Sequence, residues 1–250
     1  MLAGVAIVGL GYALAVGPLA RRTGQPGATP KQIASFAAAM LVLVFSLNGP
    51  LHDLSDYYLF SAHMGQHLLL TLLMPPLLLK GTPAWLVEGL LARPWVRAAA
   101  RRLTHPVAAG LIAAAVVAAW HFPGPYGLMM RNHDVHVVMH LSIMATGVLM
   151  WWPVASPTPA LPALPPGGKM LYLFLLGVPM SAVGAFITLA ESPLYRWYVD
   201  APRVFALSPK DDQTIGGLAM WVLGTMVLWG VMTVIWFRWG AKEDMEERET

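Results

Sequence analysis

The segment Ser61-Ala62-His63-Met64-Gly65-Gln66-His67 carries two histidines at the start of an apolar stretch that runs to Leu79. On a helix, residues at i and i+4 project from one face, one turn apart. His136 and His140 repeat this spacing inside a second apolar stretch. Ionisable side chains within membrane-spanning helices are costly and mark a functional site by default. The two histidine pairs therefore indicate both a membrane fold and the place of its chemistry.

The composition is that of a membrane protein. Of the 250 residues, 57% are hydrophobic and 12% are charged, whereas soluble domains carry about 25% charged residues. A membrane-spanning helix needs about 20 mostly apolar residues, and seven segments of the sequence meet this need. We therefore predict an all-α fold, a polytopic bundle of seven transmembrane helices.

The chain contains no cysteine, which excludes disulfides and thiolate metal ligands. Soft-metal ligands would have to come from its 8 histidines and 15 methionines. The formal net charge of +3 says little about nucleic acid in such a chain, and no nucleic-acid partner is expected. Basic residues are better interpreted as topology signals.

Seven spans are predicted between loops rich in glycine and proline. They cover residues 1–20, 32–47, 59–79, 106–120, 135–152, 170–190 and 214–237. The first has no positive charge ahead of its apolar core, as a cleaved signal peptide would have, so we expect it to remain as a span. Pro75-Pro76 should kink or thin the third span, because each proline removes a backbone donor.

Residues 1–237 are expected to form one membrane domain, followed by a charged, frayed cytoplasmic tail at residues 238–250. Residues 82–103 mix tryptophan and leucine with arginine, which predicts an interfacial amphipathic helix on a leaflet of anionic membrane lipid. We expect residues 48–58 to form a loop and residues 153–168 a proline-rich extended linker.

The positive-inside rule gives an orientation. With the N-terminus outside and the C-terminus in the cytoplasm, the 16 lysines and arginines divide 12 to 4 between the inner and outer sides. Seven of the eight histidines then lie toward the outer side, and His105 alone lies inside.

The seven outer histidines come from four segments, and the candidate metal ligands among them centre on two i, i+4 pairs, with His121 at the outer end of the fourth span. The pairs are His63 with His67 and His136 with His140. Imidazole suits copper, zinc, iron and nickel, whereas a thioether selects Cu(I). Two i, i+4 pairs on facing helices supply four nitrogens without backbone strain, and neutral ligands avoid burying charge in lipid. We therefore expect a copper site beneath the outer surface. The competing interpretation is that each histidine only links neighbouring helices by hydrogen bonds.

Further participants stay open at this stage. The thioethers of Met74 and Met144 lie one turn deeper than the histidine pairs, although buried methionines more often only pack. His52 and His133 also fall on the outer side. Three carboxylates could accept hydrogen bonds from the outer imidazoles; they are Asp53, Asp56 and Asp134.

Asp212 and Gln213 precede the last span and are followed by Gly216-Gly217. An acidic segment followed by small residues is typical of a capped helix start that packs closely on a neighbour. The functional alternative is that Asp212 and Gln213 lean over the histidines or meet a partner protein.

Several short segments follow one another from the third span to the seventh. They are residues 63–70, Pro75-Pro76-Leu77-Leu78, Trp120-His121-Phe122-Pro123, residues 136–140, Trp151-Trp152-Pro153-Val154, Pro193-Leu194-Tyr195 and Asp212-Gln213-Thr214-Ile215-Gly216-Gly217 with Met220-Trp221. In this order they resemble the CtaG-like cytochrome c oxidase assembly factors. Met139 departs from the pattern, because many members are expected to carry an acidic residue there.

The resemblance implies a multi-pass protein of the bacterial plasma membrane that is not an enzyme. It would act as a copper chaperone for a haem–copper oxidase, with an oxidase subunit as its partner and the same five histidines as functional residues. The residues themselves leave open a membrane di-iron hydroxylase or desaturase, a bis-histidine haem protein and a copper transporter. They also leave open whether the protein is a monomer or a homo-oligomer.

Overall fold

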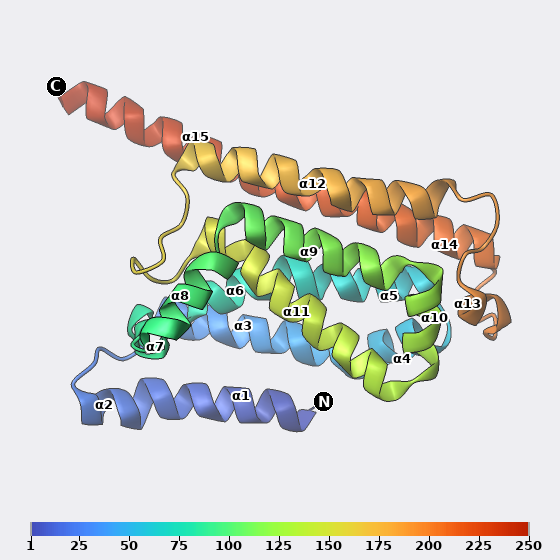
Figure 1. Cartoon of the computed structure of the whole chain (residues 1–250), viewed down its shortest axis with the longest axis horizontal. Coiled ribbons are helices and arrows are strands. Elements are labelled where there is room, and N and C mark those ends of the chain that lie inside the picture. The colour runs from blue at the N-terminus through green and yellow to red at the C-terminus, as the bar shows by residue number, and fades with distance from the viewer. Residues whose placement is uncertain (1, 250) are drawn as a thin grey trace.

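Long helices run side by side along most of the chain (Figure 1). The structure is a computed structural model that describes residues 2–249, and every regular element in this range is helical. Six helices are long and apolar enough to cross a membrane, or up to seven if the pair Pro94–Leu103 and Pro106–His121, bent by 69°, counts as one span. The predicted all-α bundle is confirmed, whereas the count of seven and the sides of the termini stay predictions. Met1 and Thr250, the ends of the predicted first span and tail, lie outside the described residues.

The long helices agree closely with the predicted spans. They are α1 (Leu2–Leu14) with α2 (Ala20–Thr23), α3 (Pro30–Leu47), α5 (Phe60–Leu68) with α6 (Met74–Gly81), α9 (Pro106–His121), α11 (His133–Ala155), α12 (Pro166–Leu189) and α14 (Pro209–Leu218) with α15 (Gly224–Glu249). Short π-helical turns join the paired segments, at Ala15–Leu19, Leu69–Leu73 and Ala219–Leu223.

Short helices gather at the two ends of the bundle (Figure 1). One end carries α4 (Pro50–Tyr57), α10 (Pro123–Arg131) and α13 (Arg196–Asp200). The opposite end carries α7 (Ala84–Leu90) and α8 (Pro94–Leu103). In the predicted orientation these are the outer and inner ends, respectively.

Four expectations for the segments outside the long spans differ from the structure. The expected loop at residues 48–58 contains α4, which begins with Pro50 at a position where proline favours a helix start. The single helix expected at residues 82–103 is two helices, because Arg93 before Pro94 is extended and α8 starts anew. The described part of the expected tail, residues 238–249, is not frayed, since α15 continues to Glu249. The linker is also shorter than expected, with α11 ending at Ala155 and α12 beginning at Pro166.

The prolines of the third span remove backbone donors, as predicted, and a π-helical turn precedes them. Pro75 has no N–H to donate to the carbonyl of Thr71, four residues earlier. The backbone there forms the π-helical turn Leu69–Leu73, and Trp151 of α11 donates its Nε1–H to the Thr71 carbonyl at 2.9 Å. Gly147 permits the close approach, because a Cβ at Gly147 would lie 3.0 Å from Cγ of Pro75. The span with the first histidine pair is thus joined to the helix with the second.

Glycines allow α14 to pack closely against α12, as the small residues Gly216-Gly217 led us to predict. A Cβ on Gly217 would lie 2.8 Å from the backbone nitrogen of Thr188 and 3.1 Å from the carbonyl oxygen of Gly184. Real Cβ atoms do not approach backbone this closely, so the two helices touch through their main chains.

We expect Gly217→Ala to destabilise the protein by about 1–3 kcal/mol, because the added methyl group forces the backbones of α12 and α14 apart. Gly230→Ala is the matched control, since a Cβ at Gly230 meets no atom within 4 Å. Thermal unfolding in detergent measures both. Equal melting temperatures for the two variants would contradict the close contact.

Candidate metal centre

The five predicted ligand histidines lie together near the end of the bundle that carries α4, α10 and α13. They come from three helices, with His63 and His67 on α5, His121 at the end of α9, and His136 and His140 on α11. Their exposed fractions range from 0% to 8%. The predicted gathering of imidazoles from distant parts of the chain is therefore present, while metal binding itself stays a prediction.

The imidazoles form one continuous cluster. Within each pair, the ring centroids lie 4.4 Å apart for His63 and His67 and 4.7 Å apart for His136 and His140. Between helices, His63 lies 5.8 Å from His136, and His67 lies 6.1 Å from His140. His121 joins the cluster through His67, at 5.4 Å. The i, i+4 spacing on two facing helices predicted this arrangement.

The cluster leaves many ring nitrogens unpaired. Seven nitrogens of the five imidazoles are buried and have no hydrogen-bond partner within residues 2–249. An unsatisfied buried polar group costs about 1–3 kcal/mol, and proteins have only about 5–15 kcal/mol of net stability. Buried polar groups in native proteins are nearly always paired. A cation coordinated by several lone pairs at once fits these residues.

The orientation of His121 is suited to a metal ligand. Its Nδ1 lies 2.6 Å from the carbonyl oxygen of Val117, and because a carbonyl can only accept, Nδ1 must carry the proton. The lone pair is then on Nε2, which is buried and unpartnered among the described residues. Metal-bound histidines typically donate their other ring N–H in this way.

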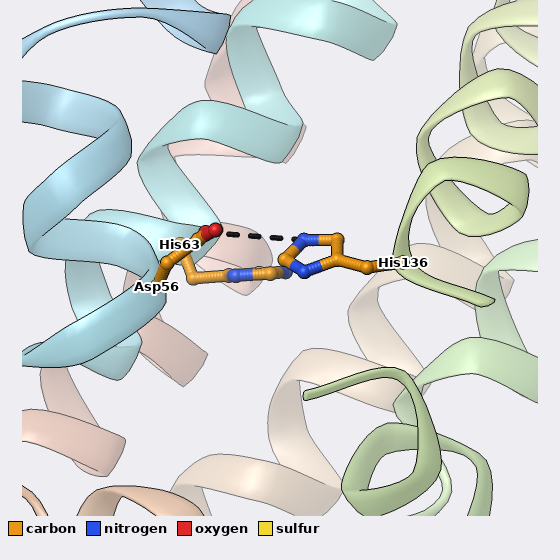
Figure 2. Close-up of side chains that lie close together, drawn as sticks. All are labelled: Asp56, His63 and His136. Atoms are coloured by element: carbon orange, nitrogen blue, oxygen red, sulfur yellow. Dashed lines mark ion pairs between the residues drawn. The ribbon is translucent and has the colours of Figure 1, made fainter. Parts of the chain in front are cut away.

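Asp56 of α4 lies beside His63 and His136 of the cluster (Figure 2). One carboxylate oxygen of Asp56 and one ring nitrogen each of His63 and His136 lie within 4.8 Å of one another. The Oδ1 atom is 3.8 Å from Nε2 of His136. The sequence predicted Asp56 only as a hydrogen-bond acceptor for the outer imidazoles, but this distance also allows it to share a metal ion with two of them.

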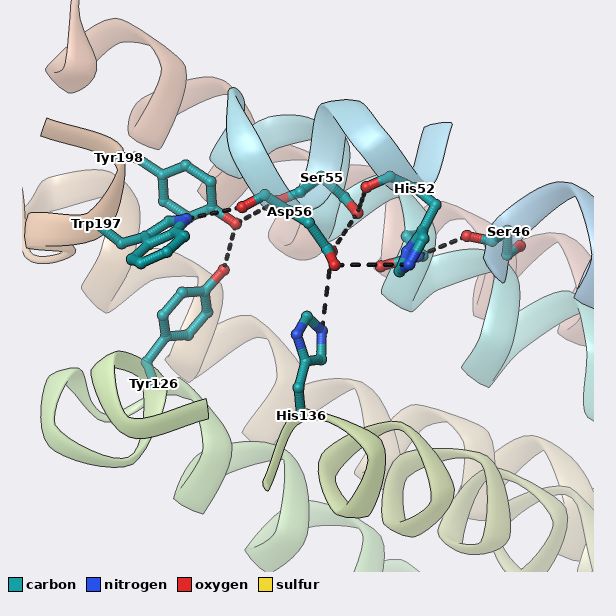
Figure 3. A network of polar contacts seen from close by, with 9 residues as sticks. Ser46, His52, Ser55, Asp56, Tyr126, His136, Trp197 and Tyr198 are labelled. Carbon is teal, nitrogen blue, oxygen red and sulfur yellow. Dashed lines mark hydrogen bonds and ion pairs between the residues drawn. The ribbon is translucent and has the colours of Figure 1, made fainter. Parts of the chain in front are cut away.

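A hydrogen-bond network holds Asp56 in place (Figure 3). The hydroxyl of Ser55 donates to Asp56 Oδ1 at 3.0 Å, and Trp197 donates its Nε1–H to the Asp56 carbonyl at 2.7 Å. Tyr198 donates its hydroxyl to the Ser55 carbonyl at 2.6 Å, and its oxygen lies 3.1 Å from that of Tyr126. Burial raises the pKa of Tyr198 and of Tyr126, so both phenols remain protonated donors at neutral pH.

Gln66, which the sequence did not single out, connects the network to His52. Its Nε2 donates to the Ser46 carbonyl at 2.5 Å and lies 3.3 Å from Nδ1 of His52. The other ring nitrogen of His52 lies 3.6 Å from Asp56. The position of Gln66 between the two histidines of α5 was the available signal, because its side chain is polar and fully buried in an apolar span.

The inner side of the cluster borders a small cavity of about 20 Å³. Two of the histidines, His67 and His121, line it together with three methionines, Met64, Met180 and Met220. The sequence analysis did not predict these methionines as ligands, because they come from three separate segments and share no spacing. Met74 and Met144, which it did single out, are not among the lining residues.

Other predicted participants lie at the surface. His133 and Asp134 are exposed at the start of α11, and His105 is exposed ahead of α9. Asp53 is also exposed. Of the three predicted carboxylates, Asp56 is the one that pairs with an imidazole among the described residues.

Asp212 supports the site by capping the helix that carries the first histidine pair. Its fully buried carboxylate accepts from the backbone nitrogens of Phe60 and Ser61 at 2.8 and 3.1 Å, and from the Ser61 hydroxyl at 2.6 Å. These N–H groups at the start of α5 have no partner within their own helix. Asp212 therefore caps α5 from another span, rather than the start of its own helix.

Gln213 joins two further segments to α14. Its Oε1 accepts from the backbone nitrogen of Leu194 at 2.6 Å, and its Nε2 donates to the Ile187 carbonyl at 3.1 Å. The cap of α14 itself is Ser208, whose hydroxyl accepts from the backbone nitrogen of Asp211. Both predicted polar residues thus hold the bundle together.

Comparison with known proteins gives a family match over nearly the whole chain. A sequence model of the cytochrome c oxidase caa3 assembly factor family, also called CtaG, matches residues 10–242. Uncharacterized proteins of Mycobacterium bovis and Mycobacterium tuberculosis are each 26% identical over 95% of this chain, and one of Mycobacterium leprae is 23% identical. The chain spans 38% of the length of each of these relatives. No solved structure matches it.

We expect Asp212→Ala to lower the free energy of unfolding by about 2–3 kcal/mol, because three hydrogen bonds to a buried carboxylate are lost at the start of α5. Asp211→Ala, at the exposed neighbouring position, should change it by about 0.5 kcal/mol or less. Thermal unfolding in detergent compares the two variants. A stable Asp212→Ala protein would refute the role of this cap.

Proposed function

Because the chain belongs to the cytochrome c oxidase caa3 assembly factor family, we propose that it binds copper at the five-histidine cluster and delivers it to an oxidase subunit. It would do so in the plasma membrane of a bacterium, with the cluster beneath the outer face. Copper is then the cargo of a chaperone, and the protein has a non-catalytic role, as expected of an assembly factor.

The buried, unpaired imidazole nitrogens carry this proposal. They present neutral nitrogen donors from three helices to one place, and imidazole is a ligand that copper accepts in both of its common oxidation states. Methionines border the same cluster, and thioethers favour copper over zinc, magnesium or calcium. His63 and His67 would hold the ion from α5, and His136 and His140 from α11.

The outer edge of the cluster is partly exposed, which supports a route for copper transfer on this side. The side chains of His52 and Asp56 are 26% and 16% exposed, whereas His63 is fully buried. A surface pocket of about 530 Å³ opens near this edge, and Trp197, which donates to the Asp56 carbonyl, is one of its lining residues together with Arg131. We propose that the oxidase subunit approaches the copper from this side.

We expect purified wild-type protein to bind copper and the double variant His63→Ala/His67→Ala to lose it, because one whole side of the cluster is removed. His133→Ala is the matched control, since His133 lies on the same helix as His136 and His140 but is exposed. Metal analysis of the purified proteins measures the difference.

Unchanged copper in the double variant would reject the cluster as the binding site. Iron or haem in place of copper would favour the oxidoreductase alternatives, and a Soret band in the absorption spectrum would identify haem at once.

The proposed orientation is tested with single cysteines, because the chain has none of its own. Arg131→Cys, at the end of α10, should react with a membrane-impermeant maleimide in intact cells. Arg97→Cys, on α8, should react only after the membrane is opened. The reverse pattern would place the cluster on the cytoplasmic side and refute delivery at the outer face.

A further inference from the structure

We propose that the cavity on the inner side of the cluster is a Cu(I) position, with His67, His121, Met180 and Met220 as its ligands. The inference rests on the proposed copper handling. Because His67 belongs to both positions, the ion occupies this inner position in place of the outer one, and the inference adds to the proposed function an oxidation state and a ligand set.

Two imidazoles with Nε2 atoms unpartnered within residues 2–249 line this cavity. His67 and His121 both line it, with ring centroids 5.4 Å apart and ring planes nearly perpendicular at 84°. The Nε2 atoms of both rings are buried and have no hydrogen-bond partner among the described residues. Since Nδ1 of His121 donates to Val117, the lone pair of its Nε2 is free for a metal.

The cavity is small. Its volume of about 20 Å³ exceeds the roughly 10–15 Å³ that one water molecule requires, so there is room for a single ion beside the lining side chains. Cu(I) is the ion best suited to a site of neutral nitrogen and sulfur ligands.

The sulfur donors lie where the helices depart from regular geometry. Met220 belongs to the π-helical turn Ala219–Leu223, and Met180 follows Pro179 inside α12. Such interruptions redirect side chains and are frequent at functional sites. Both methionines are buried, with exposed fractions of 5% and 7%.

The rest of the cavity lining offers no free oxygen ligand of the kind that harder metal ions such as Mg²⁺ or Ca²⁺ prefer. The remaining side chains are apolar apart from Thr71, whose hydroxyl already donates to the His67 carbonyl at 2.6 Å. No carboxylate is among the lining residues, whereas the outer edge of the cluster carries Asp56. The two ends of the cluster thus differ in chemistry, with a carboxylate at one and thioethers at the other.

The alternative is that the methionines only fill space, as methionines often do in helical cores. Leucine has a similar volume and no sulfur, so it separates packing from ligation. Met129→Leu is the matched control, because Met129 is buried to the same degree and does not line the cavity.

We expect the double variant Met180→Leu/Met220→Leu to weaken Cu(I) binding by about tenfold or more, since even residues that only orient a ligand contribute about 10- to 100-fold to metal affinity. The purified proteins are loaded anaerobically with Cu(I) and titrated with a Cu(I)-specific chelator. Met129→Leu should bind as the wild type does. Equal affinity of all three proteins would overturn the proposal.

X-ray absorption of the wild-type protein loaded with Cu(I) gives a test that needs no variant. We expect a sulfur shell around copper together with imidazole nitrogen. Copper surrounded by nitrogen and oxygen alone would overturn the thioether site and leave the proposed copper handling intact. A wild-type protein that binds no copper at all would reject both proposals.

Discussion

The cost of burying imidazoles without partners is the constraint on which the rest of the structure depends. Seven such nitrogens lie within the bundle, and each would reduce stability if it stayed unpaired. The surrounding contacts hold these rings in place rather than satisfy them. Asp212 caps the start of α5, and Trp151 joins α11 to the carbonyl that Pro75 leaves free. The copper proposed for this cluster would supply the partner that these lone pairs lack in the described part of the chain.

Much of the bundle and the histidine cluster could be predicted from local pattern alone. Apolar length predicted the long helices, and the i, i+4 spacing placed each histidine pair on one helix face. The predicted topology then placed both histidine pairs toward the same side of the membrane, where the two helices could face each other. His121 could be added because it ends a span on the same side. These features depend on periodicity and on the side of the membrane, both of which are readable in a single sequence.

What could not be predicted depends on contacts between distant residues. Asp212 and Phe60 are separated by 152 positions, and nothing near either residue signals the cap. The same holds for Met180 and Met220, which meet His67 only in the folded bundle. The errors at residues 48–58 and 82–103 have a local cause instead. In both segments a proline starts a helix, at Pro50 and Pro94, where composition suggested a loop or one continuous helix.

The wall that closes the cluster on its outer side is made of short elements. Asp56 lies on α4, which has 8 residues, and Trp197 lies on α13, which has 5. Hydrogen bonds from Trp197 and Tyr198 join them, and neither helix is long enough to cross the bilayer. In the proposed orientation, a copper ion that passes between these two helices would reach the exterior without a path between the long helices that span the bilayer.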